Sequence, residues 1–164
     1  MKQASAERPS ARGLRVAIVR ALFNAPVTDG LLEGARQALA EMGAGRRAVT
    51  VVEAPGAFEL PILARAAARS GRFDAIVALG AVIRGDTDHY EHIAREAAMG
   101  LSRVALRTGV PVAFGVLTVE REEQALARSA PGPDNKGAEA ARAAVATVHA
   151  LRALRRLGGK KRKR

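Results

Sequence analysis

One histidine, His89, lies where a proton-transferring side chain would be useful. It follows the polar residues 84–88, directly after the most apolar stretch of the chain, and we expect it in the first turn of a helix. An imidazole has an unperturbed pKa of about 6.5, so it can exchange protons near neutral pH. Gly85-Asp86-Thr87 adds backbone N–H groups and a hydroxyl that suit an anion. The sequence therefore predicts an acid–base residue beside an anion site, although a surface histidine at a helix start would have the same pattern.

Two cationic side chains further along the chain could bind the same anion. Arg128 closes one predicted helix and Lys136 opens the next. A guanidinium grips two phosphate oxygens in a fork, and Lys supplies a point charge. Because Asp86 and Asp88 oppose an anion, we expect a phosphate to be held by backbone N–H groups and by these cations. Taken singly, each cation is also typical of an exposed helix end.

Three phenylalanines lie close to the predicted strand ends: Phe23, Phe58 and Phe114. Each alone is typical of a protein core. Their common position favours the walls of an apolar slot for a planar ring. The sequence therefore predicts a small phosphorylated or ring-containing substrate, bound by apolar walls and cations.

A metal site and a dinucleotide site were weighed against this interpretation. His89 and His92 are three residues apart on a predicted helix, with several carboxylates nearby, and such a set could bind zinc or manganese. His-x-x-His also occurs by chance on amphipathic helices, so we predict no metal and no cofactor. Residues 23–29 lack the glycines of a Rossmann loop, and the chain lacks a P-loop lysine.

Short β-branched runs alternate with helical patterns along the chain. We expect strands at residues 14–19, 48–52, 74–83 and 111–117. We expect helices from Thr28-Asp29 to Gly43, at 58–70, at 88–107, from Thr118 onward, and at 136–156. Strands without in–out alternation, separated by helices, predict a parallel sheet covered on both faces. The predicted fold class is α/β, a three-layer αβα domain whose four-stranded parallel sheet has the flavodoxin-like order 2-1-3-4. Ligands of such sheets bind beyond the carboxyl ends of the strands.

Length and composition fit one domain, which we place at residues 14–157. A polar segment, 1–13, precedes it, and a flexible basic tail, 158–164, follows. The chain has no cysteine, which excludes disulfides, thiolate zinc sites and cysteine nucleophiles. No secretory leader and no membrane span is expected, so a cytoplasmic location is predicted.

The formal net charge of +11 is concentrated at the carboxyl end, because residues 152–164 contain Lys and Arg but no acid. Such an end is usually a solvated terminus, and weak contact of the tail with RNA or an acidic partner is the alternative. Aromatic residues make up 3% of the chain, too few for a base-stacking platform.

Several motifs, in one order, resemble the lumazine synthase family. They are Phe23-Asn24, residues 55–61, residues 80–90, residues 111–118, Glu123-Gln124-Ala125 with Arg128, and Asn135-Lys136-Gly137. The resemblance covers about residues 14–157. It implies a transferase of riboflavin synthesis that needs no cofactor. Its two small-molecule substrates, 5-amino-6-(D-ribitylamino)uracil and 3,4-dihydroxy-2-butanone 4-phosphate, condense to 6,7-dimethyl-8-ribityllumazine with release of phosphate and water.

The resemblance also implies a role for each matching position. The residues implied for the pyrimidine and ribityl groups are Phe23, Ala57, Phe58, Glu59, Ala81, Val82, Ile83 and Phe114. The residues implied for the phosphate are Asp86, Thr87 and Arg128, with Lys136 close by. His89 would be the proton donor and acceptor.

Assembly is implied by the resemblance too. Family members form homopentamers with active sites between neighbouring subunits, and many pack these pentamers into icosahedral shells. Two positions depart from the family pattern: Leu22 replaces a common Arg, and residues 130–134 contain two prolines. A slow or inactive relative that binds flavin-like ligands is the alternative function.

Overall fold

Four parallel strands form the centre of the molecule. The computed structural model describes residues 9–159. The strands are β1 (Val16–Ala21), β2 (Val49–Ala54), β3 (Ala75–Ile83) and β4 (Val112–Val119). They lie in the order β2-β1-β3-β4, and all three pairings are parallel. The predicted sheet order is confirmed.

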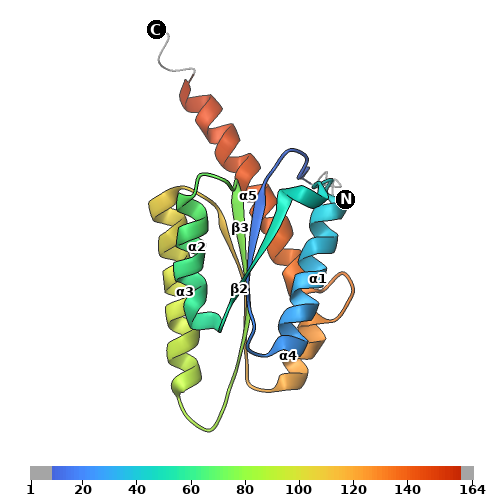
Figure 1. Ribbon diagram of the computed structural model, residues 1–164, viewed down its shortest axis with the longest axis vertical. Coiled ribbons are helices and arrows are strands. Elements are labelled where there is room, and N and C mark those ends of the chain that lie inside the picture. Colours follow the sequence, from blue (N-terminus) through green and yellow to red (C-terminus); the bar gives the residue numbers. More distant parts are fainter. Residues whose placement is uncertain (1–8, 160–164) are drawn as a thin grey trace, which may run out of the picture.

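Helices cover both faces of this sheet (Figure 1). One face carries α1 (Ala25–Glu41), α4 (Glu122–Ser129) and α5 (Lys136–Gly159), and the other carries α2 (Leu60–Arg69) and α3 (His89–Thr108). Two short 3₁₀ turns, η1 (Arg46–Ala48) and η2 (Ala57–Glu59), flank β2. The result is the predicted three-layer αβα arrangement.

The core has two halves because successive side chains of a strand point to opposite faces of the sheet. Ile18 and Val77 pack with α1 and α5, whereas Val19 and Ile76 pack toward α2 and α3. β3 is buried along nearly its whole length. Burial on both faces explains why its sequence is continuously apolar rather than alternating.

The first helix begins earlier than the sequence indicated. Thr28-Asp29 was expected to cap it, but α1 starts at Ala25, with Pro26 in its first turn. Proline suits this turn because its φ is already helical and its missing N–H has no partner to lose. The N-cap is Asn24, in the left-handed conformation with φ 59°. Thr28 is instead fully buried, within the helix.

Ordered structure reaches beyond residues 14–157 at both ends, but only the amino-terminal extension is packed against the domain. Residues 9–13 form no strand, yet Ala11 is fully buried and its N–H donates to the Met42 carbonyl over 2.8 Å. At the other end, α5 includes Gly158 and Gly159, which the sequence had assigned to the tail. Residues 1–8 and 160–164 lie outside the described part. Among residues 9–159, none of the helices combines the length and apolar character needed to cross a membrane.

Candidate active site

A hollow of ≈ 380 Å³ lies beyond the carboxyl ends of β1 and β3, on the α2–α3 side of the sheet. It gathers residues from three segments of the chain that are far apart in sequence. Its lining consists of Phe23, Asn24, Gly56, Ala57, Phe58, Glu59, Ala81, Val82, Ile83, Gly85, Thr87, His89, Tyr90 and Ile93. This is the edge at which parallel sheets bind ligands.

The Phe23 loop is held by backbone and side-chain hydrogen bonds. The N–H groups of Leu22 and Phe23 donate to the carbonyls of Ala54 and Pro55, at 2.8 and 3.1 Å, so β1 and β2 stay paired beyond the strands. The Asn24 side-chain amide donates to the Ala81 carbonyl over 2.9 Å and ties this loop to β3. The Phe23 ring is 71% exposed. An exposed ring on a fixed loop offers a stacking surface to a planar ligand.

The end of β3 presents backbone polar groups to the hollow. β3 pairs with β1 only as far as Leu79, whereas it pairs with β4 up to Ile83. Residues 81–83 therefore have no strand partner on the β1 side. The Ala81 carbonyl accepts from Asn24, and the remaining groups of this edge can meet the donors and acceptors of a ligand.

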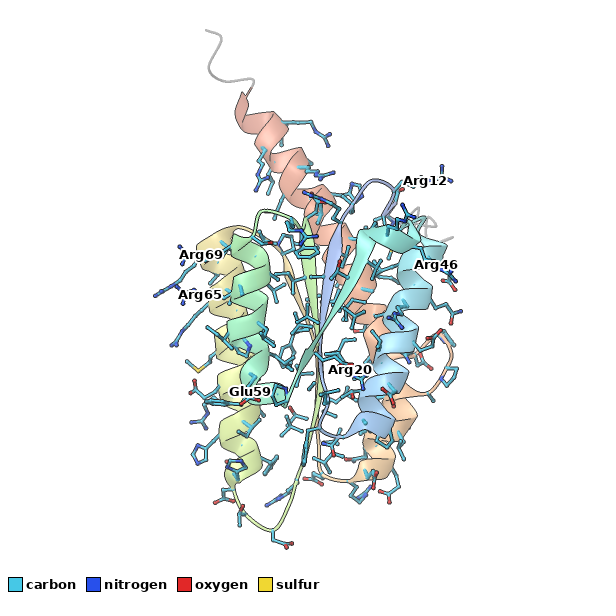
Figure 2. The ribbon with its side chains drawn as sticks, in the orientation of Figure 1. Arg12, Arg20, Arg46, Glu59, Arg65 and Arg69 are labelled. Carbon is cyan, nitrogen blue, oxygen red and sulfur yellow. The ribbon has the colours of Figure 1, made fainter. Side chains whose placement is uncertain are left out.

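The segment after β2 forms the opposite wall. Ala57 is buried, while the Phe58 ring is 55% exposed. Glu59 lies at the end of η2, directly before α2, and its carboxylate approaches Gly56, where any side chain would crowd it. In Figure 2, Glu59 lies at the end of the molecule near the strand carboxyl ends. A carboxylate here can accept hydrogen bonds from ligand hydroxyls.

His89 is the first residue of α3 and is exposed. Within residues 9–159 its imidazole has no hydrogen-bond partner, so both ring nitrogens are open to a ligand. The preceding residues, 84–88, are exposed as well. Arg84 lies 3.9 Å from Glu120 and 5.6 Å from the Tyr90 ring centre. Thr87 lines the hollow and Asp86 does not.

Asp86 lines neither hollow, and the other three predicted residues lie at a second hollow, of ≈ 330 Å³, along β4. Phe114, Arg128 and Lys136 line it, together with α5 residues on the opposite face of the sheet from His89. Arg128 donates to the Gln124 carbonyl over 3.0 Å, and Lys136 pairs with Glu139 at 2.5 Å. Within one chain the predicted site residues therefore fall into two separate sets.

Asn135 holds the backbone from which Arg128 and Lys136 extend. It is 2% exposed, and its side-chain amide faces the carbonyls of Gly30, Ser129 and Ala130 at 3.0, 2.8 and 3.1 Å. Its carbonyl oxygen accepts the N–H of Ala138 over 3.0 Å, which caps α5. The end of α4 and the start of α5 are thereby bound to α1, so the backbone at Arg128 and Lys136 is held in place.

Comparison with known proteins identifies the family. The family model described as 6,7-dimethyl-8-ribityllumazine synthase matches residues 13–152. The chain belongs to the lumazine synthase family. It is 50% identical over 141 residues to 6,7-dimethyl-8-ribityllumazine synthase 1 of Caulobacter vibrioides, which covers 86% of this chain and 92% of that protein. It is 53% identical over 142 residues to the 6,7-dimethyl-8-ribityllumazine synthase of Edwardsiella ictaluri, which covers 86% of this chain and 91% of that protein.

In this member of the lumazine synthase family, some residues that line the first hollow were not predicted from the sequence. Tyr90 and Ile93 line the first hollow from α3, and their spacing of three on one helix face was the available signal. Asn24 and Asn135 belong to motifs of the family resemblance, but no role was predicted for either side chain. Asn before a helix is a common cap, which was the signal for both.

The structure also bears on the departure at Leu22 and on the alternative of a metal site at His89 and His92. Leu22, in place of an arginine, is 43% exposed and makes its backbone bond to Ala54. Among residues 9–159 no group of three or more potential ligands is arranged to hold a metal ion. His89 and His92 therefore gain no geometric support as a metal pair.

Proposed function

We propose that this chain is the transferase that condenses 5-amino-6-(D-ribitylamino)uracil with 3,4-dihydroxy-2-butanone 4-phosphate to 6,7-dimethyl-8-ribityllumazine, releasing phosphate and water. The observation that carries the proposal is the first hollow, where a ring platform, a free strand edge, a carboxylate and a histidine meet in a chain of this family. The same pocket gives no specific support to a flavin-binding relative without catalysis.

The proposal places the pyrimidine substrate in the first hollow. Its ring stacks on Phe23, and its uracil edge faces the backbone groups of residues 81–83. The ribityl chain then runs toward Ala57 and Phe58, where Glu59 accepts from its hydroxyls. This placement leaves the reacting amines on the side of His89 and Thr87.

The chemistry needs proton transfer rather than a cofactor. A substrate amine attacks the ketone carbonyl, and the carbinolamine must lose water to give an imine. After loss of the phosphate, the second substrate amine attacks the remaining carbonyl to close the ring, a second water leaves, and each of these steps requires a proton to move. His89 can donate and accept these protons, because its ring is exposed to the hollow and has no partner within residues 9–159.

The phosphate substrate requires cations that the first hollow lacks. In this proposal Arg128 and Lys136 of one subunit, with Phe114, face Asp86, Thr87 and His89 of its neighbour. The separation of the two hollows within a single chain supports this arrangement, because neither holds a complete set. A homopentamer is the assembly that we propose. A chain without cysteine is suited to the reducing cytoplasm, where we place the reaction.

The direct test follows product formation by absorbance and fluorescence from the two substrates. His89→Ala should lower kcat by about a hundredfold, the usual contribution of a general acid–base group. His92→Ala is the matched control, since His92 is exposed on the same helix but does not line the hollow. Absence of turnover in the folded wild-type oligomer would overturn the proposed function.

Mixing experiments test the shared site. Arg128→Ala should raise the KM for the phosphate substrate, whereas Arg36→Ala, on exposed α1 surface, should not. At a phosphate-substrate concentration well below the KM of Arg128→Ala, His89→Ala and Arg128→Ala subunits, unfolded and refolded together, should regain roughly a quarter of the wild-type activity, because about one neighbouring pair in four of a randomly mixed head-to-tail ring has both residues intact. If mixing restores nothing, the two hollows do not combine across subunits.

A further inference from the structure

The end of the molecule opposite the proposed active site carries a separate concentration of charge. We call it the amino pole, the end at which β1, β2, β3 and β4 begin. Each helix runs back antiparallel to the strands, so the carboxyl ends of α2, α3 and α5 all lie at this pole (Figure 1). Side chains from distant parts of the sequence are therefore brought together there.

A groove of ≈ 730 Å³ opens between α2 and α3 in this region. Arg65 and Arg69 line it from α2, and Arg103 and Arg107 from α3. The two residues of each pair are four apart, so they lie on one side of their helix, about 6 Å apart along its axis. No carboxylate lines the groove, and within residues 9–159 these four arginines form no ion pair.

The excess of positive charge extends beyond the groove. Arg152, Arg155 and Arg156 lie in the last turns of α5, and Arg46 and Arg47 precede β2. Acids lie at the same end too: Asp74 pairs with Arg152 at 3.0 Å, and Glu41, the last residue of α1, lies 3.9 Å from Arg142. Figure 2 shows Arg12, Arg46, Arg65 and Arg69 toward this end and Glu59 toward the other.

Acids gather instead at the opposite pole, in the segments that follow β3 and β4. They are Asp86, Asp88, Glu91, Glu120, Glu122 and Glu123. That pole also carries the cations Arg84, Arg121, Arg128 and Lys136, so its charge is mixed, whereas the charge of the amino pole is mostly positive. A pole of one sign attracts polymers of the other sign over several ångströms of solvent.

The arginine side chains and the shape of the groove favour a phosphodiester chain as its ligand. A guanidinium binds a phosphate through two parallel hydrogen bonds, which an ammonium cannot do. A bilayer surface is flat and cannot enter a groove, whereas an extended strand can lie in it between the two rows of arginines. We propose that the amino pole binds single-stranded nucleic acid through its phosphates. With few aromatic side chains for stacking, binding is independent of base sequence.

The test measures binding of a fluorescein-labelled oligouridine to the full-length chain by fluorescence anisotropy, from about 50 to 200 mM salt. The expected Kd is about 10⁻⁵ M at physiological salt, the range of sequence-independent binding. Replacing Arg65, Arg69, Arg103 and Arg107 with Gln should weaken binding. It should also lower the slope of log K against log salt by up to about 3, because each contact to a single strand contributes about 0.7.

Matched variants separate the groove from other charges. Arg107→Gln should weaken binding and Arg95→Gln should not, because Arg95 is exposed on the same helix but lies toward its start and outside the groove. A chain that ends at Gly159 tests the basic tail and should keep the dependence on the groove. Lumazine formation should be unchanged in all these variants.

Four results would overturn the proposal. The quadruple variant could bind oligouridine as tightly as the wild type. Polyglutamate of equal charge could compete as well as RNA, which would indicate an acidic protein partner. Anionic phosphatidylserine vesicles could bind while oligouridine does not. A changed sedimentation coefficient in the Gln variants would show that the groove is covered by a neighbouring subunit.

Discussion

Replacing Asn135 with Ala should destabilise the protein more than its small size suggests. The side chain is 2% exposed and joins α1, the end of α4 and the start of α5. Alanine removes the amide and fills none of its space. The carbonyls of Gly30 and Ser129 then lose a donor, and the buried N–H of Ala138 loses its acceptor.

The magnitude follows from the bonds that are lost. The amide has two hydrogens for three nearby carbonyls, so at most two full hydrogen bonds are donated, and one is accepted. Three bonds at about 1 kcal/mol each, with about 1–2 kcal/mol for a buried N–H left unpaired, give about 4–5 kcal/mol. This is a large share of the free energy of unfolding of a domain of this size, about 5–15 kcal/mol.

The measurement is unfolding in guanidinium chloride at a fixed protein concentration, because assembly adds to the apparent stability. Gln37→Ala is the control, since Gln37 makes an exposed 3.0 Å bond to Glu41, and its loss should cost less than about 0.5 kcal/mol. Asn135→Ser is the milder variant if the alanine chain does not fold. In either variant the KM for the phosphate substrate should rise while that for the pyrimidine stays unchanged. An unfolding midpoint of Asn135→Ala equal to that of Gln37→Ala would refute the reasoning.

Three further predictions concern the positioning of the site. Gly137→Ala should lower stability by about 3 kcal/mol in denaturant unfolding, because the new methyl group would collide with the Leu31 carbonyl where α5 crosses α1; an unchanged midpoint would contradict this contact. Asn24→Gly should lower the free energy of unfolding by about 1 kcal/mol, because the hydrogen bond to Ala81 is lost. Asn24→Ala should lower it by about 2 kcal/mol, because alanine is also strained in the left-handed backbone conformation of this position. Equal losses in the two variants would show that φ plays no part. Phe23→Ala should leave the thermal midpoint unchanged, since the ring is 71% exposed, but raise the KM for the pyrimidine about fivefold to tenfold if stacking contributes about 1 kcal/mol.

The layers and the strand order could be predicted from sequence because burial leaves a strong pattern. β3 is apolar along its length, and only a strand covered on both faces has that pattern. The start of α1 could not be predicted in the same way. Thr28-Asp29 has the composition of a cap, but Pro26 already fixes a helical φ upstream, and Asn24 takes the conformation that ends the loop.

The resemblance to the family implied a site shared between neighbouring subunits, and most of the residues proposed for it lie at two separate hollows of one chain. Reasoning from strand ends assigns His89 and Arg128 to the same edge of the sheet, but in the structure Arg128 lies in the last turn of α4, beside the hollow along β4. β3 continues into α3 on one face, however, and β4 continues into α4 on the other. The thickness of the sheet therefore separates the two side chains, and no local sequence pattern records which face a crossover takes.

The two halves of the proposed site differ in how firmly the backbone holds them. The N–H of Ala138 in α5 is buried and bonded to Asn135, so it should exchange with deuterium only when the whole domain opens. Residues 85–88, just before His89, are exposed, and their backbone contributes only the Asp88 carbonyl to a turn with Glu91. Their amides should exchange within the shortest labelling times. In the proposed site we therefore expect residues 85–88 to adjust to a bound phosphate more readily than the backbone at Arg128.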